Sequence, residues 1–174
     1  MAATIPPLSD GIIFIRSLTH HDAPDHLAGE DDEIIKWLSG GRSNTVTVAA
    51  YIERSLESWQ NSGPVRPFGG FDCATCRLIG SIEANLARSL ESGQPNLSYS
   101  IFRQWRRQGM ALRAIDLMGE YLHIAREARQ MVLRISPDNV ASMKLAERSG
   151  FTPLGVFEEP EGPMARFIRD LRQP

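Results

Sequence analysis

The stretch WRRQGMA, residues 105–111, places two arginines and a glycine between an apolar segment and a helical one. The first backbone N–H groups of a helix have no partner within the helix and carry a partial positive charge. Phosphate oxygens satisfy both where the backbone can approach closely, as Gly109 and Ala111 allow. Arg106 and Arg107 add fixed positive charge suited to a pyrophosphate. The stretch predicts a phosphate-binding turn, with a basic loop before a helix as the plainer alternative.

The turn matches neither of two common nucleotide-binding loops. No Gly-Lys-Ser/Thr follows Gly109, which excludes a Walker loop, and only one of the three glycines of the dinucleotide fingerprint is present. The six residues alone therefore do not choose among phosphorylated ligands.

Hydrophobic spacing predicts the elements that must position this turn. Apolar, β-branched runs predict strands over residues 11–18, 68–72, 77–87, 97–102, 130–135, 151–157 and 165–171. Apolar residues three and four apart predict one or two short helices within 20–38 and longer ones near 47–59, 111–125 and 138–149. This order predicts an α/β (α+β) protein with one domain over residues 1–174. We expect a mixed central sheet of about six to seven strands with helices on both faces.

Composition bounds the class of protein. The 174 residues are 42% apolar, and 19 Lys and Arg against 21 Asp and Glu give a net charge of −2. That balance argues against a nucleic-acid surface, for which only Arg103, Arg106, Arg107 and Arg113 are available. No apolar run is long enough to span a bilayer, and the N-terminus does not read as a signal peptide. Cys73 and Cys76 form one CATC, interpreted as a turn with reduced thiols in a cytoplasmic protein.

Several motifs together resemble the GNAT superfamily of N-acetyltransferases. The family's Arg/Gln-x-x-Gly-x-Gly/Ala loop is matched by residues 106–111, and its Asn near the next helix start and closing Gly-Phe by Asn139 and residues 150–151. LSYSIF, residues 97–102, resembles the family's splayed strand. IFIRSL, EDDEIIKWL and RLIGSI look like the RimJ/RimL-type branch, which acetylates protein N-termini and other amines. The resemblance covers about residues 12–171.

The resemblance implies acetyl-CoA as cofactor. Backbone groups near the end of the splayed strand would pair with the pantetheine arm, and loop N–H groups would hold the pyrophosphate. Asn139 and Ser142 would face the pantetheine and the thiol, and Asn139 also suits a helix N-cap. The implied cofactor contacts are Ile101, Phe102, Arg103, Arg106, Arg107, Gln108, Gly109, Met110, Ala111, Asn139 and Ser142.

Acetyl transfer to an amine needs a base, an oxyanion donor and an acid for the leaving thiolate. Glu83 is the candidate base, because burial in its apolar run would raise the pKa of the carboxyl; an outward-facing strand residue is the alternative. Many family members carry a Tyr where this chain has Ala146. The RimJ/RimL-type branch often lacks this Tyr and has a Ser at the position of Ser142, so the resemblance implies Ser142 as the candidate acid. Tyr99 is a second one if its hydroxyl faces the cleft rather than packing in the strand.

Two acidic stretches, residues 29–33 and 158–162, fall where this family shapes its acceptor cleft. They could attract a cationic amine such as a peptide N-terminus, a polyamine or an aminoglycoside, or they could be solvated loops. The leading hypothesis is direct transfer of the acetyl group to a primary amine, with a protein or peptide N-terminus ahead of a small molecule. The enzyme would be a monomer or homodimer with no metal, membrane or nucleic-acid partner. The alternative is an acyl-CoA-binding sensor or partner protein with little catalytic activity.

Overall fold

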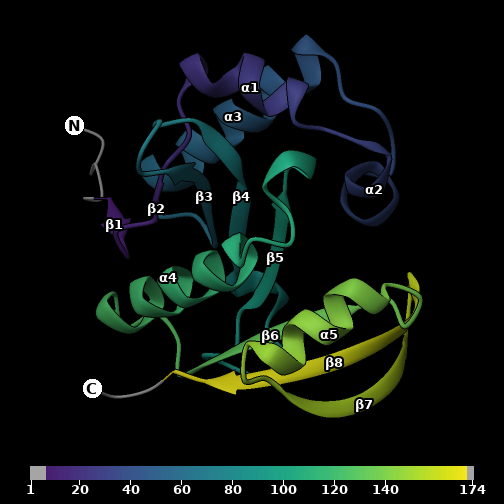
Figure 1. Ribbon diagram of the computed structural model, residues 1–174. Helices are drawn as coiled ribbons and strands as arrows, with labels where there is room; N and C mark the ends of the chain where they lie inside the picture. Colours follow the sequence, from purple (N-terminus) through teal and green to yellow (C-terminus); the bar gives the residue numbers. More distant parts are fainter. Residues whose placement is uncertain (1–6, 172–174) are drawn as a thin grey trace.

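The computed structural model describes residues 7–171, which form one mixed sheet with helices packed on both faces (Figure 1). Within these residues, eight strands lie in the order β1-β2-β3-β4-β5-β6-β8-β7. The strands are β1 (Leu8–Ser9), β2 (Ile13–Arg16), β3 (Val65–Asp72), β4 (Leu78–Asn85), β5 (Asn96–Ile101), β6 (Gln130–Ile135), β7 (Thr152–Glu159) and β8 (Gly162–Asp170). The sheet has one strand more than the upper end of the predicted six to seven. The additional strand is β1, whose two residues carry too little hydrophobic pattern to be recognised.

The helices lie between these strands in the order that the spacing predicts. They are α1 (Ala23–Ala28), α2 (Asp32–Ile34), α3 (Thr45–Gln60), α4 (Met110–Ile124) and α5 (Val140–Arg148). Short helical turns are η1 (His20–Asp22), η2 (Ile35–Ser39), η3 (Leu86–Arg88) and η4 (Arg103–Trp105). Helix α3 starts earlier than expected, because the Asn44 side chain caps it and Thr47 completes a capping box instead of serving as the N-cap.

Two apolar cores lie on the two faces of the sheet. Helix α4 packs Ile115, Met118 and Leu122 into the larger core, and the same core continues under α5. Helices α1 and α3 cover the other face, where Val48 and Ile52 lie in a second core. Figure 1 shows α1 and α3 together at the top of the view, apart from α4 and α5.

The sheet opens between its two parallel strands. Strands β5 and β6 pair only through Asn96 with Val132 and Leu97 with Leu133. On its other side β5 stays paired with β4 up to Ile101. Beyond Leu97 the two parallel strands separate, and one edge of β5 lacks a strand partner. The LSYSIF segment is thus the splayed strand that the sequence indicates.

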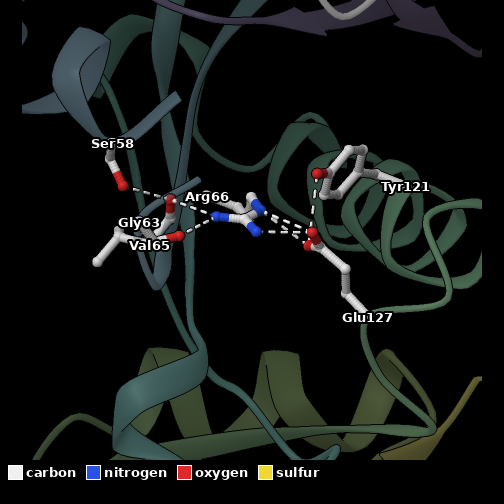
Figure 2. Close-up of polar contacts among 6 residues, drawn as sticks. All are labelled: Ser58, Gly63, Val65, Arg66, Tyr121 and Glu127. Carbon is white, nitrogen blue, oxygen red and sulfur yellow. Dashed lines mark hydrogen bonds and ion pairs between the residues drawn. The ribbon is translucent and has the colours of Figure 1, made fainter. Parts of the chain in front are cut away.

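An ion pair beside the sheet ties β3 to the end of α4 (Figure 2). The Arg66 guanidinium contacts the Glu127 carboxylate at 2.6 and 2.8 Å, and the Tyr121 hydroxyl donates to the same carboxylate at 3.4 Å. Arg66 also donates to the carbonyl oxygens of Gly63 and Val65. The side chains of Arg66 and Glu127 are only 12% and 22% exposed. This cluster stabilises the scaffold, away from the turn at residues 105–111.

The CATC segment forms the turn between β3 and β4, and Cys73 and Cys76 are free thiols. Across residues 7–171, no helix is long and apolar enough to cross a membrane. The same residues contain no group of three His, Cys, Asp or Glu side chains arranged to hold a metal ion.

Candidate active site

The turn at residues 105–111 connects the open strand β5 to α4. Strand β5 ends at Ile101, the η4 turn follows, and α4 begins at Met110. Arg107 and Gly109 both have positive φ, 60° and 79°. A Cβ at Gly109 would meet no atom within 4 Å, so its surroundings are open toward the helix start. Met110 is buried and Ala111 packs against the core, so these two can offer a ligand only their backbone.

The backbone of this turn has the unpaired N–H groups that an anion needs. Gly109 is the N-cap of α4 and supplies no side-chain cap. Among the described residues, none accepts a hydrogen bond from the N–H groups of residues 107–112, and the first donor after them is Arg113, which binds the Gly109 carbonyl at 3.2 Å. Adjacent unpaired N–H groups at the positive end of a 15-residue helix form an anion-binding site.

Arg106 has partners other than the expected phosphate. Its Nε donates to the Ile101 carbonyl at 2.8 Å, and its Nη atoms contact Asp31 at 2.8 and 2.9 Å and Glu33 at 3.0 Å. The Arg103 and Arg107 side chains are exposed and pair with no other described residue. The fixed positive charge open to an anion is therefore that of Arg103 and Arg107, and the Arg106 guanidinium faces away from the turn.

The remaining side chains of the turn make only local contacts. Gln108 is exposed and donates to the Gln104 carbonyl at 2.8 Å. Arg113 pairs with Asp10 at 2.6 Å. With Arg106 and Arg113 both ion-paired, half of the basic patch that a nucleic-acid interface would use is neutralised.

A shallow groove of about 390 Å³ runs along the outer side of α4, next to Gly109. Its charged lining is Asp10, Asp116 and Glu120 against the single cation Arg113. Asp10 is paired with Arg113 and Asp116 with Arg169, so the groove offers an anion no cation without a carboxylate partner. Phosphate groups therefore fit the N–H end of α4 better than this groove.

The open edge of β5 presents backbone groups of Tyr99 and Ile101. The Phe102 N–H donates to the Ile79 carbonyl of β4 at 2.8 Å. Because backbone polar groups alternate in direction along a strand, Ser100 and Phe102 face β4 while Tyr99 and Ile101 face the gap toward β6. The Ile101 carbonyl is occupied by Arg106. An extended ligand arm would accordingly meet the Tyr99 backbone and the Ile101 N–H, and the expected backbone contact of Phe102 does not fit.

Three of the predicted residues gather on the α5 side of this gap. The Asn139 side chain caps α5 by accepting from the Ser142 N–H at 3.1 Å, so the expected N-cap is confirmed. Burial raises the pKa of the Tyr99 hydroxyl, and the neighbouring Ser142 hydroxyl partly offsets this rise. That buried Tyr99 oxygen has no hydrogen-bond partner of good geometry among the described residues. Ala146 is fully buried and brings no acid.

Glu83 lies on the opposite face of the sheet. It pairs across strands with Ser98, whereas Tyr99 pairs with Ile82 on the other face. Burial raises the pKa of the half-buried Glu83 carboxyl, the direction expected for a base. No hydrogen bond or ion pair from a described residue compensates this carboxylate. Glu83 is thus a desolvated carboxylate facing the α1 and α3 side.

The functional roles of Tyr51, which lies beside Glu83, and of His26, which contacts Tyr51, are missed from the sequence. Burial and then the Glu83 charge raise the pKa of Tyr51 to about 12, so its hydroxyl keeps its proton at neutral pH. The Tyr51 ring lies 5.2 Å from the ring of His26, which in turn stands edge-on to Phe102 at 6.4 Å. Burial lowers the pKa of His26. Tyr51 follows the apolar spacing of α3, and this spacing indicates only a core position.

The acidic side chains of the stretch at residues 29–33 pair with residues outside the stretch. Asp31 and Glu33 contact Arg106, Asp32 contacts Arg42 at 2.8 Å, and Glu30 accepts from the N–H and hydroxyl of Ser43 at 2.7 and 2.6 Å. In the second stretch, Glu159 pairs with Arg166 and Glu161 with Arg88, both at 2.8 Å. The charges of these carboxylates are therefore largely neutralised, and Glu158 is the exposed carboxylate of the two stretches that has no partner among the described residues.

The fold and this geometry define a class of protein that binds an extended anionic cofactor in the splay of a mixed sheet. A family model described as "Acetyltransferase (GNAT) domain" matches residues 13–152. The chain therefore belongs to the GNAT family of acetyltransferases, enzymes that take their acetyl group from acetyl-CoA. No curated protein sequence matches the chain.

Solved structures share the fold at low sequence identity. An acetyltransferase of the GNAT family from Bacillus anthracis superposes with a TM-score of 0.82 at 12% identity, covering 97% of this chain and all (100%) of that one. RimL, an alpha-N-protein acetyltransferase in complex with coenzyme A, gives 0.79 at 15% identity, with 96% and 97% covered. An aminoglycoside acetyltransferase in complex with coenzyme A gives 0.73 at 18%, with 91% and 94% covered.

Proposed function

We propose that this enzyme transfers an acetyl group from acetyl-CoA directly to a primary amine, with the two substrates entering from opposite faces of the sheet. The observation that carries this proposal is the placement of Tyr99 and Ser142 on one face of the sheet and of Glu83 on the opposite face. Coenzyme A would lie on the α4 and α5 side and extend its acetyl end through the gap. The amine would approach from the α1 and α3 side.

Cofactor binding in this proposal relies mainly on the backbone. The N–H groups of residues 107–112 would hold the pyrophosphate, with Arg103 and Arg107 adding charge. The pantetheine arm would pair with the Tyr99 backbone and the Ile101 N–H. Asn139 would hold the start of α5 in place, so that Ser142 faces the thiol end.

The chemistry balances with the groups present. The amine nitrogen bonds to the thioester carbonyl carbon while its proton passes to Glu83, directly or through a water molecule. The carbon–sulfur bond breaks, and the thiolate takes a proton from the hydroxyl of Ser142 or Tyr99. That oxygen then regains a proton from solvent water, and Glu83 releases to solvent the proton that it took from the amine. The raised pKa of Glu83 makes the carboxylate a stronger base than an exposed one. An α-amino group, with a pKa of about 8, needs less help than a lysine amine with a pKa of about 10.4.

The charge pattern favours a peptide or protein N-terminus over a polycation such as a polyamine or aminoglycoside. Every acid at residues 30–33 is held by an arginine or by Ser43, which leaves Glu83 as the unpaired carboxylate on this face of β4. One carboxylate suits an acceptor with one positive charge. This assignment agrees with RimL as a structural neighbour and supports the RimJ/RimL-type branch. The free thiols of Cys73 and Cys76 support a cytoplasmic enzyme.

The test combines transfer with binding. Thiol release from acetyl-CoA is measured with a short peptide bearing a free α-amine, the same peptide with a blocked N-terminus, spermidine and an aminoglycoside. We expect release with the free peptide and none with the blocked one. In parallel, CoA at about 100 times its Kd should stabilise the fold by roughly 2.7 kcal/mol in thermal unfolding.

A second function has one specific observation in its favour. The buried Ala146 stands where many relatives carry a tyrosine acid, so a sensor that binds acyl-CoA without efficient transfer fits the same cradle. Stabilisation by CoA without thiol release on any amine would support the sensor. The absence of stabilisation by CoA and acetyl-CoA would contradict both functions.

A further inference from the structure

Arg106 joins two separate segments of the chain, the end of β5 and residues 31–33. Its guanidinium contacts the end of β5 at the Ile101 carbonyl, the residue before α2 at Asp31, and α2 itself at Glu33. The contact with Asp31 uses both carboxylate oxygens, at 2.8 and 2.9 Å. Paired nitrogen–oxygen contacts of this kind fix orientation as well as distance. The Arg106 and Asp31 side chains are 26% and 23% exposed, so solvent screens this pair less than a fully exposed one.

The segment held by Arg106 forms one wall of the proposed acceptor side. Asp31 also accepts from the Ile34 N–H at 3.1 Å and so caps α2. Gly29 lies against the Phe102 ring so closely that a Cβ at this position would overlap it. His26, one helical turn earlier, stands between the rings of Phe102 and Tyr51. Residues 26–33 therefore form a continuous contact from Tyr51, beside Glu83, to the cofactor turn.

We propose that Arg106 is a positioning residue for the acceptor and not a ligand of the cofactor phosphates. Its contacts with Asp31, Glu33 and the Ile101 carbonyl fix the wall of residues 26–33 against the end of β5. The acceptor amine would then meet a preformed site beside Glu83. This inference rests on the proposed function for its kinetic consequence, and on the structure alone for the contacts themselves.

The alternative role for Arg106 carries a structural cost. To reach a phosphate, the guanidinium would have to leave one carbonyl and two carboxylates, and Asp31 would keep a charge that Arg106 now stabilises. The Arg106 hydrogen bond is the first cause of the lowered pKa of Asp31. Arg107, one residue further, is exposed and has no partner among the described residues, so it can bind a phosphate without such a loss.

The test uses four single variants and one double variant, and it measures the binding of CoA and of the acceptor separately. Arg106→Gln and Asp31→Asn each remove one side of the contact, and Arg106→Lys keeps the charge but loses the paired geometry. Arg107→Gln is the matched control in the same turn. Calorimetry gives the Kd for CoA, and steady-state kinetics with the free peptide gives KM and kcat.

We expect Arg106→Gln and Asp31→Asn to raise the acceptor KM several-fold with the Kd for CoA unchanged. The double variant should be no worse than Arg106→Gln alone, because both changes remove one interaction. Arg106→Lys should restore KM only in part. Arg107→Gln should weaken CoA binding and leave the acceptor KM unchanged. A weaker Kd for CoA in Arg106→Gln but not in Asp31→Asn, or tighter CoA binding in Asp31→Asn, would overturn the inference.

A measurement without an acceptor separates this inference from the proposed function. Hydrogen exchange on the free protein should show faster exchange at residues 26–34 in Arg106→Gln and Asp31→Asn, with α4 and β6 unchanged. Unchanged exchange at residues 26–34 would overturn the inference even if the wild type acetylates amines. Faster exchange together with no thiol release on any amine would contradict the proposed function and leave the positioning role supported.

Discussion

The proposed cofactor site and the proposed acceptor site, on opposite faces of the sheet, are built in different ways. On the cofactor side, all proposed contacts except Ser142 of α5 come from one stretch, residues 99–112, and most are backbone groups at the end of a strand and the start of a helix. On the acceptor side they are side chains from distant elements: His26 from α1, Tyr51 from α3 and Glu83 from β4. A backbone site depends on local conformation, and a side-chain site depends on how the whole domain packs. Changes on the two sides should consequently affect different steps.

The largest expected effect is on the acceptor side. Glu83→Gln keeps the shape of the side chain and removes the base, so kcat should fall by about 10²- to 10⁴-fold. The Kd for CoA should not change, because Glu83 faces away from the cofactor turn. Glu57→Gln, an exposed carboxylate on α3, is the control and should leave kcat as in the wild type. A wild-type kcat in Glu83→Gln would remove Glu83 from the mechanism.

The matching change on the cofactor side is Gly109→Asp. It places a carboxylate at the unpaired N–H groups, in open space at the helix start. We expect CoA affinity to fall about 100-fold, equivalent to about 3 kcal/mol. Titration calorimetry measures this loss, and circular dichroism should show a folded domain. Gly109→Ala, with the same positive φ, should cost only about 1 kcal/mol in stability. Unweakened CoA binding by folded Gly109→Asp would contradict the placement of the pyrophosphate.

The pH dependence sharpens the role of Glu83. Because the base acts when it is ionised, turnover should decrease as the pH falls through the pKa of Glu83, which burial raises above that of an exposed glutamate. A weakly basic aromatic amine that stays uncharged over the pH range isolates this effect from titration of the acceptor. The decrease in kcat should disappear in Glu83→Gln. An identical acid limb in the two proteins would assign the titration to another group.

The smallest effect on activity is expected far from both sides. Glu127→Gln leaves the Arg66 guanidinium without its carboxylate, and the partial exposure of the pair limits the loss to about 2 kcal/mol of unfolding free energy. Thermal unfolding should show a Tm lower by roughly 4–8 °C. CoA affinity and kcat at a temperature where the variant is folded should match the wild type. A change in either would connect this cluster to the site.

The same comparison explains how much the sequence could predict. The turn between strand and helix at residues 106–111 and the capping role of Asn139 are local, so the short pattern and the strand and helix around it are sufficient to predict them. The splay of residues 97–102 depends on the distant strand β6, and only the resemblance to the family implied it. The carboxylate partners of Arg106 lie more than 70 residues away, in α2 and directly before it, and no spacing rule connects them with Arg106. Tyr51 and His26 follow the ordinary pattern of core helices, and only the packing of the folded domain places Tyr51 beside Glu83 and His26 against Tyr51.

The backbone direction in β5 shows a finer limit. The resemblance placed the pantetheine contacts at Ile101, Phe102 and Arg103, whereas the hydrogen bond from Phe102 to Ile79 turns Phe102 toward β4. The bulge in the pairing of β3 with β4 shifts the register between Gly70 and Phe71, next to Ile79 on β4. A motif locates the end of the strand, but the pairing of β5 with β4 decides which of its N–H groups face the gap.

The most direct test of entry from opposite faces is a crystal structure of the complex with CoA. We predict pyrophosphate oxygens within about 3 Å of the N–H groups of residues 107–112. The pantetheine should run along Tyr99 and Ile101, and its sulfur should point through the gap toward Glu83. A pyrophosphate held by the Arg106 guanidinium or in the groove outside α4, or a sulfur that stays on the α5 side away from Glu83, would contradict the account.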